Sequence, residues 1–262
     1  MTGQQEFSRL ALLASDTERA QEAALVLRDA FDWVPLSRAD AVVVLGGDGF
    51  MLQTLHGMLD SSRIVPAYGM NCGTVGFLMN RYRSPAKLLD RIAKAKAFQI
   101  APIKMNATLR DGSSVEARAI NEVSLLRETR QTAKIEISVD GKVRLSEVVC
   151  DGVLLATPAG SSAYNLSANG PILPLDSQLL ALTAISAFRP RRWSGAILPE
   201  RSQVTFRIKE PEKRPVSAVA DQHEFRDIAE VQLEIDRENQ LVLLFDPGHA
   251  LDERIVAEQF AV

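Results

Sequence analysis

The chain has few of the residues that bind structural metals or form disulfides. Its 262 residues include two cysteines, Cys72 and Cys150, and three histidines. The cysteines are too far apart for a CxxC unit, and no histidine accompanies them at metal-ligand spacing. We therefore expect no structural zinc and a reducing, cytoplasmic location.

Long apolar runs and basic runs are also scarce. No segment approaches the length of a membrane span, and the apolar stretch Leu10–Ala14 is too short for a signal peptide. The formal net charge is -3, and the single cationic cluster is Arg189–Arg192. We expect a soluble, unprocessed protein without a footprint for nucleic acid or for an anionic membrane.

Short apolar runs alternate with helical patterns over the first hundred residues. Phe7–Ala14 and Ala41–Leu45 predict strands, and the second is apolar throughout, as in a strand buried on both faces. Ser15 and Glu18 have the spacing of a capping box for a helix ending near Ala30. This alternation predicts βαβ units around a parallel sheet. Further elements are expected at Phe50–Leu59 (helix), Ile64–Tyr68 (strand) and Pro85–Lys96 (helix).

From Ile103 onward, β-rich segments are separated by turn signals, including Asp111-Gly112 and Asp140-Gly141. We predict an α/β, Rossmann-like nucleotide-binding domain over residues 1–101. An all-β, sandwich-like domain is predicted over 102–245, and residues 246–262 are expected to pack back on the first domain. The later strands expected in the β domain are Val204–Ile208, Pro215–Ala220, Val231–Ile235 and Leu241–Phe245.

The tetrapeptide Gly46-Gly47-Asp48-Gly49 directly follows the buried strand, at the edge where open α/β sheets bind ligands. Its glycines allow the backbone to approach a phosphate and to point N–H groups at it. Asp48 can then orient or deprotonate a hydroxyl, or hold a magnesium ion. A tight strand-to-helix turn capped by Asp48 explains the same residues equally well.

A second glycine segment, Asn71-x-Gly73-x-x-Gly76, differs from the dinucleotide fingerprint only at its first position. A dehydrogenase site requires an acidic residue at the end of the next strand, about 20 residues on. Asp90 falls inside a helical pattern instead, which argues against hydride transfer. The segment is as consistent with a simple glycine turn as with a ligand contact. The chain also lacks the GxxxxGK[ST] loop of P-loop NTPases.

Polar residues interrupt two strand-like runs in the second half. Asn121 and Glu122 lie within the first run, and both side chains can reach one ligand only at a strand end or bulge. The second run leads into the small and hydroxylated segment Asp151–Gly170, where Tyr164 supplies one aromatic ring. Such a surface can bind ribose and phosphate while the ring packs on a base, and an ordinary loop is the alternative.

In order and spacing, these motifs resemble the NAD kinase family: Gly46–Gly49, Asn121-Glu122 and Thr157–Tyr164, with Asn71–Leu78 similar to that family's glycine stretch. The resemblance implies an ATP-dependent, magnesium-requiring phosphoryl transfer to the 2′-hydroxyl of the adenosine ribose of NAD, which gives NADP. It also implies an α/β domain with a β-sandwich domain, assembled as a homo-oligomer, either a dimer or a tetramer.

The same resemblance implies roles for individual residues. Asp48 corresponds to the catalytic aspartate, the proposed general base, and Gly49 joins it in contacting the dinucleotide. No residue of this chain is implied as a metal ligand. The remaining residues implied to bind NAD are Asn121, Glu122, Asp151, Ala159, Ser162, Ala163, Tyr164, Asn165, Leu166, Ser167 and Gln222.

Two other functions compete with this interpretation. Lipid kinases share a GGDG turn, but the chain has no basic amphipathic helix for docking on a membrane. A non-catalytic dinucleotide sensor would bind NAD without consuming ATP. The formation of NADP from NAD and ATP separates all three hypotheses.

Overall fold

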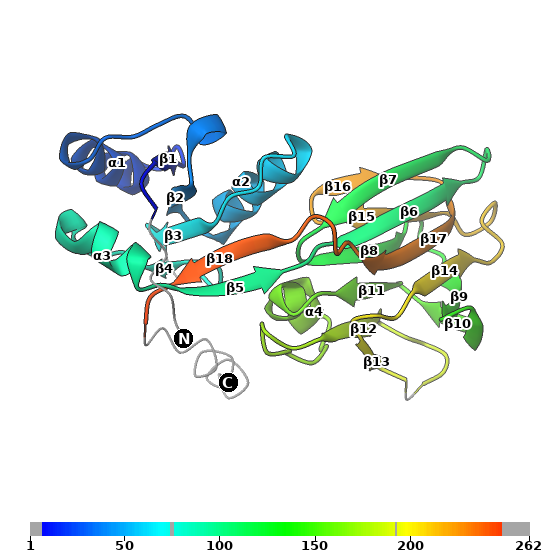
Figure 1. Cartoon of the computed structure of the whole chain (residues 1–262). Helices are drawn as coiled ribbons and strands as arrows, with labels where there is room; N and C mark the ends of the chain where they lie inside the picture. The colour runs from blue at the N-terminus through cyan, green and yellow to red at the C-terminus, as the bar shows by residue number, and fades with distance from the viewer. Residues whose placement is uncertain (1–6, 74–75, 192, 248–262) are drawn as a thin grey trace. The chain divides into compact units, whose positions relative to one another are not determined.

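The computed structural model describes residues 7–73, 76–191 and 193–247 of the chain (Figure 1). These residues form two compact units. Of the described residues, those from 7 to 100 and from 239 to 247 form the first unit, and those from 101 to 238 form the second. The chain therefore leaves the first unit once and returns to it.

The first unit is built on one sheet. Its strands are β1 (Leu10–Ala14), β2 (Ala41–Gly46), β3 (Ala67–Asn71), β4 (Asn80–Arg81), β5 (Lys96–Ile100) and β18 (Leu241–Phe245). The order is β1-β2-β3-β18-β5, and β4 pairs with β3. All pairs are parallel except that of β18 with β5. The parallel sheet expected from the alternating pattern is confirmed.

Helices cover both faces of this sheet, which explains why β2 is buried along its whole length. The helices are α1 (Glu18–Ala30), α2 (Asp48–Asp60) and α3 (Leu88–Ala93), with short 3-10 turns at Leu36–Arg38 and Pro85–Lys87. Side chains of α1 and α3 pack on the face that carries Val43 and Tyr68. Met51 of α2 lies against Gly69, whose position faces the other side because neighbours alternate along a strand.

Two predicted helix boundaries are wrong. The capping box does not form, because the helix begins after Thr17, whose side chain makes no capping bond. The Ser15 hydroxyl instead bonds that of Thr17, and the Ser15 N–H donates to Leu45 O as an extension of the sheet. The helix expected over Pro85–Lys96 ends at Ala93, since Lys96 already pairs in β5.

The strand Leu241–Phe245 belongs to the first unit, although the sequence pattern placed it in the β domain over 102–245. It runs parallel to β3, with Leu243 opposite Ala67, and antiparallel to β5. An apolar run cannot reveal its partner strand when that partner lies about 175 positions earlier in the sequence. Residues 248–262, expected to pack back on the first domain, lie outside the described residues.

A buried asparagine links β18 to the rest of the sheet. The Asn80 amide nitrogen donates to Gly69 O (3.0 Å) and to Leu244 O (2.9 Å), and its oxygen accepts the Asp246 N–H (2.8 Å). The Tyr68 hydroxyl also donates to the Asp246 carboxylate, at 2.5 Å. Burial and this carboxylate raise the pKa of Tyr68 well above its usual value. These bonds satisfy polar groups that the parallel ladder leaves unpaired.

The described residues of the second unit form twelve strands in two antiparallel sheets. They are β6 (Ile103–Leu109), β7 (Ser114–Ala119), β8 (Glu122–Arg127), β9 (Ala133–Val139), β10 (Lys142–Cys150), β11 (Gly152–Ala156), β12 (Leu179–Ile185), β13 (Gly195–Pro199), β14 (Val204–Ile208), β15 (Val216–Ala220), β16 (His223–Phe225) and β17 (Ile228–Ile235). The sheet orders are β10-β9-β14-β17-β6-β7 and β13-β12-β11-β8-β15-β16. Ile137 and Phe206 of one sheet share a single core with Leu125 and Leu155 of the other.

The predicted hairpin turn at Asp140-Gly141 is confirmed. It joins β9 to β10, with Val139 opposite Lys142, and both turn residues have positive φ (52° and 72°), as a type I′ turn requires. The turn at Asp111-Gly112 lies in a longer loop between β6 and β7, where the Gly112 N–H donates to Leu109 O.

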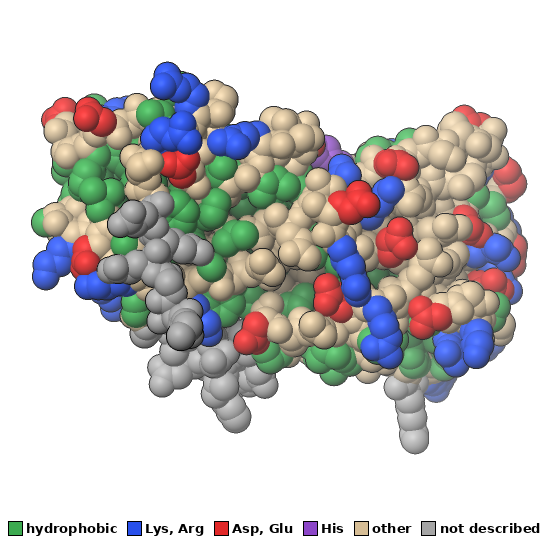
Figure 2. Space-filling view, viewed as in Figure 1, with side chains coloured by type: hydrophobic (Ala, Val, Ile, Leu, Met, Phe, Trp, Pro, Cys, Tyr) green, Lys and Arg blue, Asp and Glu red, His purple; other side chains and the backbone are tan. Residues whose placement is uncertain are grey.

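Charged side chains of both signs are interspersed over the face shown in Figure 2. Ion pairs in the structure include Arg207 with Glu230 and Arg110 with Asp227, each at 2.9 Å. Among the residues that the structure describes, no helix combines the length and the apolar character needed to cross a bilayer.

We predict that Asn80→Ala destabilises the protein by about 3 kcal/mol, because it leaves two buried carbonyls and one N–H without partners. Urea denaturation of the purified variant measures this loss. Asn106→Ala, on the partly exposed β6, is the matched control and should cost less than about 0.5 kcal/mol. Equal losses in the two variants would contradict the role given to Asn80.

Candidate functional site

Asp48 lies where β2 ends and α2 begins. Gly47 occupies the N-cap and Asp48 is the first helical residue, so the interpretation of Asp48 as the helix cap is wrong. Its carboxylate instead accepts the backbone N–H groups of Phe77 (2.6 Å) and Leu78 (3.1 Å). These two bonds fix the direction of a half-buried carboxylate at the carboxyl end of the sheet.

The two glycine motifs of the sequence meet at this carboxylate. A Cβ atom on Gly76 would lie 2.5 Å from Asp48 Oδ1, so a larger residue there would displace this carboxylate. The Cys72 N–H donates to Gly46 O (2.8 Å), which joins the ends of β2 and β3. A Cβ on Gly49 would meet no atom within 4 Å, so the protein's own packing does not require that glycine.

A second cluster forms in the second unit around Asn121 and Glu122. Both residues lie at the break between β7 and β8, where the chain passes from one sheet to the other. The carboxylate of Asp221, in the turn between β15 and β16, accepts the N–H groups of Ile120 (2.6 Å), Asn121 (2.9 Å) and Glu122 (3.1 Å). The pair thus lies at a strand end, the position at which both side chains can reach one ligand.

The hydroxylated segment after β11 packs against the same corner. The buried Thr157 hydroxyl donates to Ile120 O (2.7 Å) and accepts the Gly160 N–H (3.1 Å). The Thr157 N–H donates to Asn121 O (2.9 Å). A Cβ on Gly160 would lie 2.2 Å from that same oxygen, so glycine is required there. The backbone of the hydroxylated segment is therefore held directly against Asn121.

Glu122 is the most strongly perturbed carboxyl of this cluster. Burial raises its pKa to about 7, and the negative charge of Asp221 adds to this effect. The backbone N–H of Tyr164 binds the carboxylate and acts in the opposite direction. Oε2 is buried and has no hydrogen-bond partner among the described residues. Burial also raises the pKa of the Tyr164 hydroxyl, with smaller effects from Glu122 and Asp151.

The remaining residues implied to bind NAD differ in accessibility. Asn165 is fully buried; its amide donates to Ser161 O (3.1 Å) and Pro171 O (2.9 Å), and its oxygen accepts from Thr183 (2.7 Å). The Asp151 carboxylate is paired with Arg127 at 2.6 Å. The other positions are buried (Ala159), intermediate (Ser162, Ala163, Leu166) or exposed (Ser167, Gln222).

The structure thus gathers the predicted residues into two clusters, one in each unit. Asp48 lies with the glycine segment in the first unit, and Asn121, Glu122 and Tyr164 lie together in the second. Thr157 belongs to the predicted motif, and the run Asp221-Gln222-His223 is expected to reach the site, but the sequence does not predict the backbone contacts by which Thr157 and Asp221 hold the second cluster. A carboxylate directly after a strand, as at Asp221, is the signal that points to such a turn.

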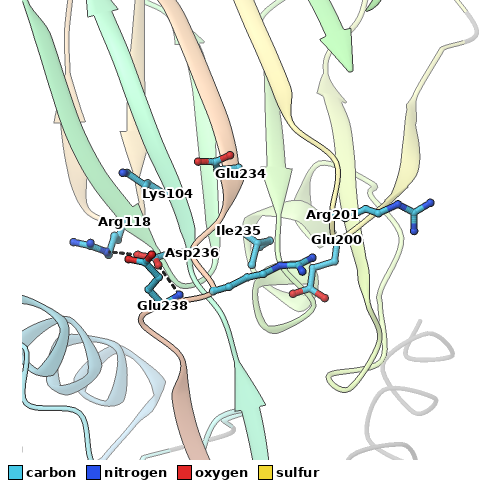
Figure 3. A pocket seen from close by; sticks show the side chains of 9 residues that line it. Lys104, Arg118, Glu200, Arg201, Glu234, Ile235, Asp236 and Glu238 are labelled. Carbon is cyan, nitrogen blue, oxygen red and sulfur yellow. Dashed lines mark hydrogen bonds and ion pairs between the residues drawn. The ribbon is translucent and has the colours of Figure 1, made fainter. Parts of the chain in front are cut away.

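The second unit also contains a cavity of about 480 Å³ (Figure 3). Its walls are Lys104, Arg118, Glu200, Arg201, Glu234, Ile235, Asp236, Arg237 and Glu238, and none of these is a predicted site residue. Arg118 Nε bonds the buried Asp236 at 2.7 Å, so charges of opposite sign partly neutralise each other there. In the described ranges, no three His, Cys, Asp or Glu side chains gather as a metal site.

Comparisons with known proteins decide the family. The model of the ATP-NAD kinase C-terminal domain matches residues 120–245. An NAD kinase of Rhizorhabdus wittichii is 61% identical over 254 residues, which cover 97% of this chain and 98% of the relative. The chain belongs to the NAD kinase family. An NAD kinase of Zymomonas mobilis is 59% identical, with 97% and 98% coverage. The chain is accordingly an enzyme, a kinase that phosphorylates NAD.

Solved NAD kinase structures share the fold. A yeast NADH kinase complexed with NADH has a TM-score of 0.81 at 21% identity, and the match covers 98% of this chain and 88% of that one. An NAD kinase from Archaeoglobus fulgidus in complex with ATP has a TM-score of 0.75 at 22% identity, with 97% and 99% coverage. At these identities the likeness concerns the fold alone.

Glu122→Gln should change how stability depends on pH. An ordinary glutamate loses its proton near pH 4.5, whereas folded Glu122 keeps it to about pH 7. The native state therefore binds more protons in this window, and the Glu122 contribution to stability falls as pH rises through it. The glutamine variant does not titrate, so its stability relative to the wild type should rise from pH 4.5 to 7 and then stay constant, by about 3 kcal/mol in total.

Urea denaturation of both proteins between pH 4.5 and 8 measures this difference. The exposed Glu116→Gln on β7 controls for the removal of one carboxylate from the protein. The raised pKa of Glu122 would be disproved if the difference in free energy of unfolding between Glu122→Gln and the wild type stayed constant across the range, or if it shrank as pH rises.

Proposed function

We propose that the enzyme transfers the γ-phosphoryl group of ATP to the 2′-hydroxyl of the adenosine ribose of NAD, giving NADP and ADP. The observation that carries this proposal is the Asp48 carboxylate, which two backbone N–H groups orient at the carboxyl end of a buried parallel strand. Phosphoryl transfer depends mainly on such positioning and on charge stabilisation.

Asp48 serves as the general base in this reaction. Its carboxylate accepts the proton of the 2′-hydroxyl while that oxygen bonds to the γ-phosphorus. The bond between the γ-phosphorus and the bridging oxygen breaks, and ADP leaves with the electron pair. Gly49, which has open space beside its Cα, lets the dinucleotide approach the backbone next to this carboxylate.

The second cluster binds the dinucleotide. Asn121 and Glu122 offer polar side chains at a rigid corner, and the buried Oε2 of Glu122 is an acceptor for a ribose hydroxyl. The partly exposed Tyr164 ring supplies a stacking surface for a base. The buried Asn165 supports this cluster from the protein interior. The other proposed contacts to NAD come from Asp151, Ala159, Ser162, Ala163, Leu166, Ser167 and Gln222.

ATP is the proposed phosphoryl donor, and Mg²⁺ enters as the complex with its phosphates. Mg²⁺ commonly binds through substrate phosphates and one or two carboxylates. The solved complexes of family members with NADH and with ATP support these two ligand classes. When bound, the ion neutralises phosphate charge.

We also propose a cytoplasmic location and assembly as a homo-oligomer. Cys72 and Cys150 are free thiols, as in proteins of a reducing compartment. Phe188 and Ile197 are exposed by 53% and 52%, and Ile197 lies on the edge strand β13. Exposed apolar side chains of this kind favour contacts between subunits.

Incubation with ATP, Mg²⁺ and NAD, followed by detection through an NADP-specific dehydrogenase, tests the activity. Asp48→Asn should fold and bind NAD but lose turnover by about 10³-fold, since general-base catalysis contributes 10²–10⁴. Asp60→Asn, at the other end of the same helix, is the control and should keep full turnover. An active Asp48→Asn enzyme would remove Asp48 as the base, and NAD binding without NADP formation by the wild type would indicate a sensor.

A further inference from the structure

Asp221 makes a set of contacts that the proposed chemistry does not use. It occupies the two-residue turn between β15 and β16, where Ala220 pairs with His223. Its φ is 50°, a left-handed conformation that costs energy for any residue with a Cβ atom. Its own N–H donates to Glu122 O at 3.1 Å. With the three N–H groups that its carboxylate accepts, Asp221 connects a turn to a corner about 100 positions earlier in the chain.

These contacts provide hydrogen-bond acceptors for backbone N–H groups at the β7–β8 corner. Where the chain leaves β7 and enters β8, the N–H groups of residues 120–122 point at one carboxylate, at 2.6, 2.9 and 3.1 Å. Hydrogen bonds to an ionised acceptor are about twice as strong as neutral ones. A single charged side chain thus fixes three successive peptide groups, and with them the directions of the Asn121 and Glu122 side chains.

The corner is also held from its opposite side. The Thr157 hydroxyl binds Ile120 O, and Gly160 packs its Cα directly on the Asn121 backbone. The corner is therefore fixed between two segments, one after β11 and one after β15. Asp221 holds the corner through a charged carboxylate, whereas Thr157 and Gly160 hold it through uncharged groups.

We propose that Asp221 is a positioning residue, which holds the Asn121–Glu122 corner in the shape that receives the dinucleotide. This inference rests on the proposed function, because it concerns the same dinucleotide site. Asp221 acts on NAD through the backbone of residues 120–122.

Electrostatics gives Asp221 a second effect on the same site. The titratable groups that face Glu122 in the described structure are the charged Asp221, from the β15–β16 turn, and the neutral Tyr164, from α4 (Tyr164–Ser167). Asp221 is negative and favours the protonated form of Glu122. Because ribose hydroxyls donate to a carboxylate, NAD binding should strengthen as pH rises through about 7, the pKa of Glu122.

Asp221→Asn tests both effects of Asp221, the positioning of the corner and the negative charge beside Glu122. Asparagine tolerates positive φ, but it carries no charge and presents an NH₂ group to the corner. The KM for NAD should rise about tenfold, while the KM for ATP changes less than twofold. Titration of NAD by calorimetry should show the pH midpoint of binding moved to lower pH by roughly half a unit.

Asp140→Asn is the matched control. Asp140 also lies in a hairpin turn with φ of 52°, and its carboxylate accepts one backbone N–H, from Gln203 at 2.9 Å. It shares the backbone conformation and the type of hydrogen bond but has no contact with the corner. Its KM values and pH profile should equal those of the wild type.

Asp221→Glu keeps the charge and serves if Asp221→Asn does not fold. Its longer side chain should raise the KM for NAD without moving the pH midpoint. An Asp221→Asn enzyme with unchanged KM for NAD and unchanged pH midpoint overturns the proposal, as does an Asp221→Glu enzyme with a wild-type KM. If the wild type binds NAD but forms no NADP, the proposed function fails, and dissociation constants for NAD still decide the role of Asp221.

Discussion

Backbone N–H groups at the ends of strands need acceptors, and in this protein two carboxylates provide them. In the first unit Asp48 binds the N–H groups of Phe77 and Leu78, and in the second unit Asp221 binds those of residues 120–122. A buried N–H without a partner costs free energy comparable to a lost hydrogen bond. Each carboxylate therefore fixes a turn and becomes fixed by it, which gives both clusters the rigidity that a binding site needs.

Glycine makes these close contacts possible. Gly76 lets the chain pass Asp48, and Gly160 lets the hydroxylated segment lie on the backbone of Asn121. In both places a Cβ atom would collide with an oxygen at 2.5 Å or less. The small residues that mark the motifs thus serve the packing of the protein as well as access for a ligand. Gly49 differs, because nothing in the protein crowds it.

Glu122 shows how a site can carry a cost for stability. A buried carboxyl beside another carboxylate keeps its proton to about pH 7, so the folded state loses stability as pH rises from 4.5 to about 7 and regains none above it. Its buried Oε2 is an acceptor that the described residues leave unused. A ligand hydroxyl that donates a hydrogen bond to Oε2 would stabilise the ionised carboxylate in the folded protein. The raised pKa of Glu122 therefore agrees with a role in ligand binding.

The family and the main motifs can be read from the sequence, because they are local patterns: the fully apolar run of β2, the glycines around Asp48, and the turn residues Asp140-Gly141. Strand pairing, and the turn that each carboxylate holds, depend on contacts that form only in the folded chain. Leu241–Phe245 reads as one more strand of the β domain, yet it completes the first sheet through Asn80. Asp221 and residues 120–122 meet across about 100 positions, and hydrogen bonds over such separations leave no periodic signal in the sequence.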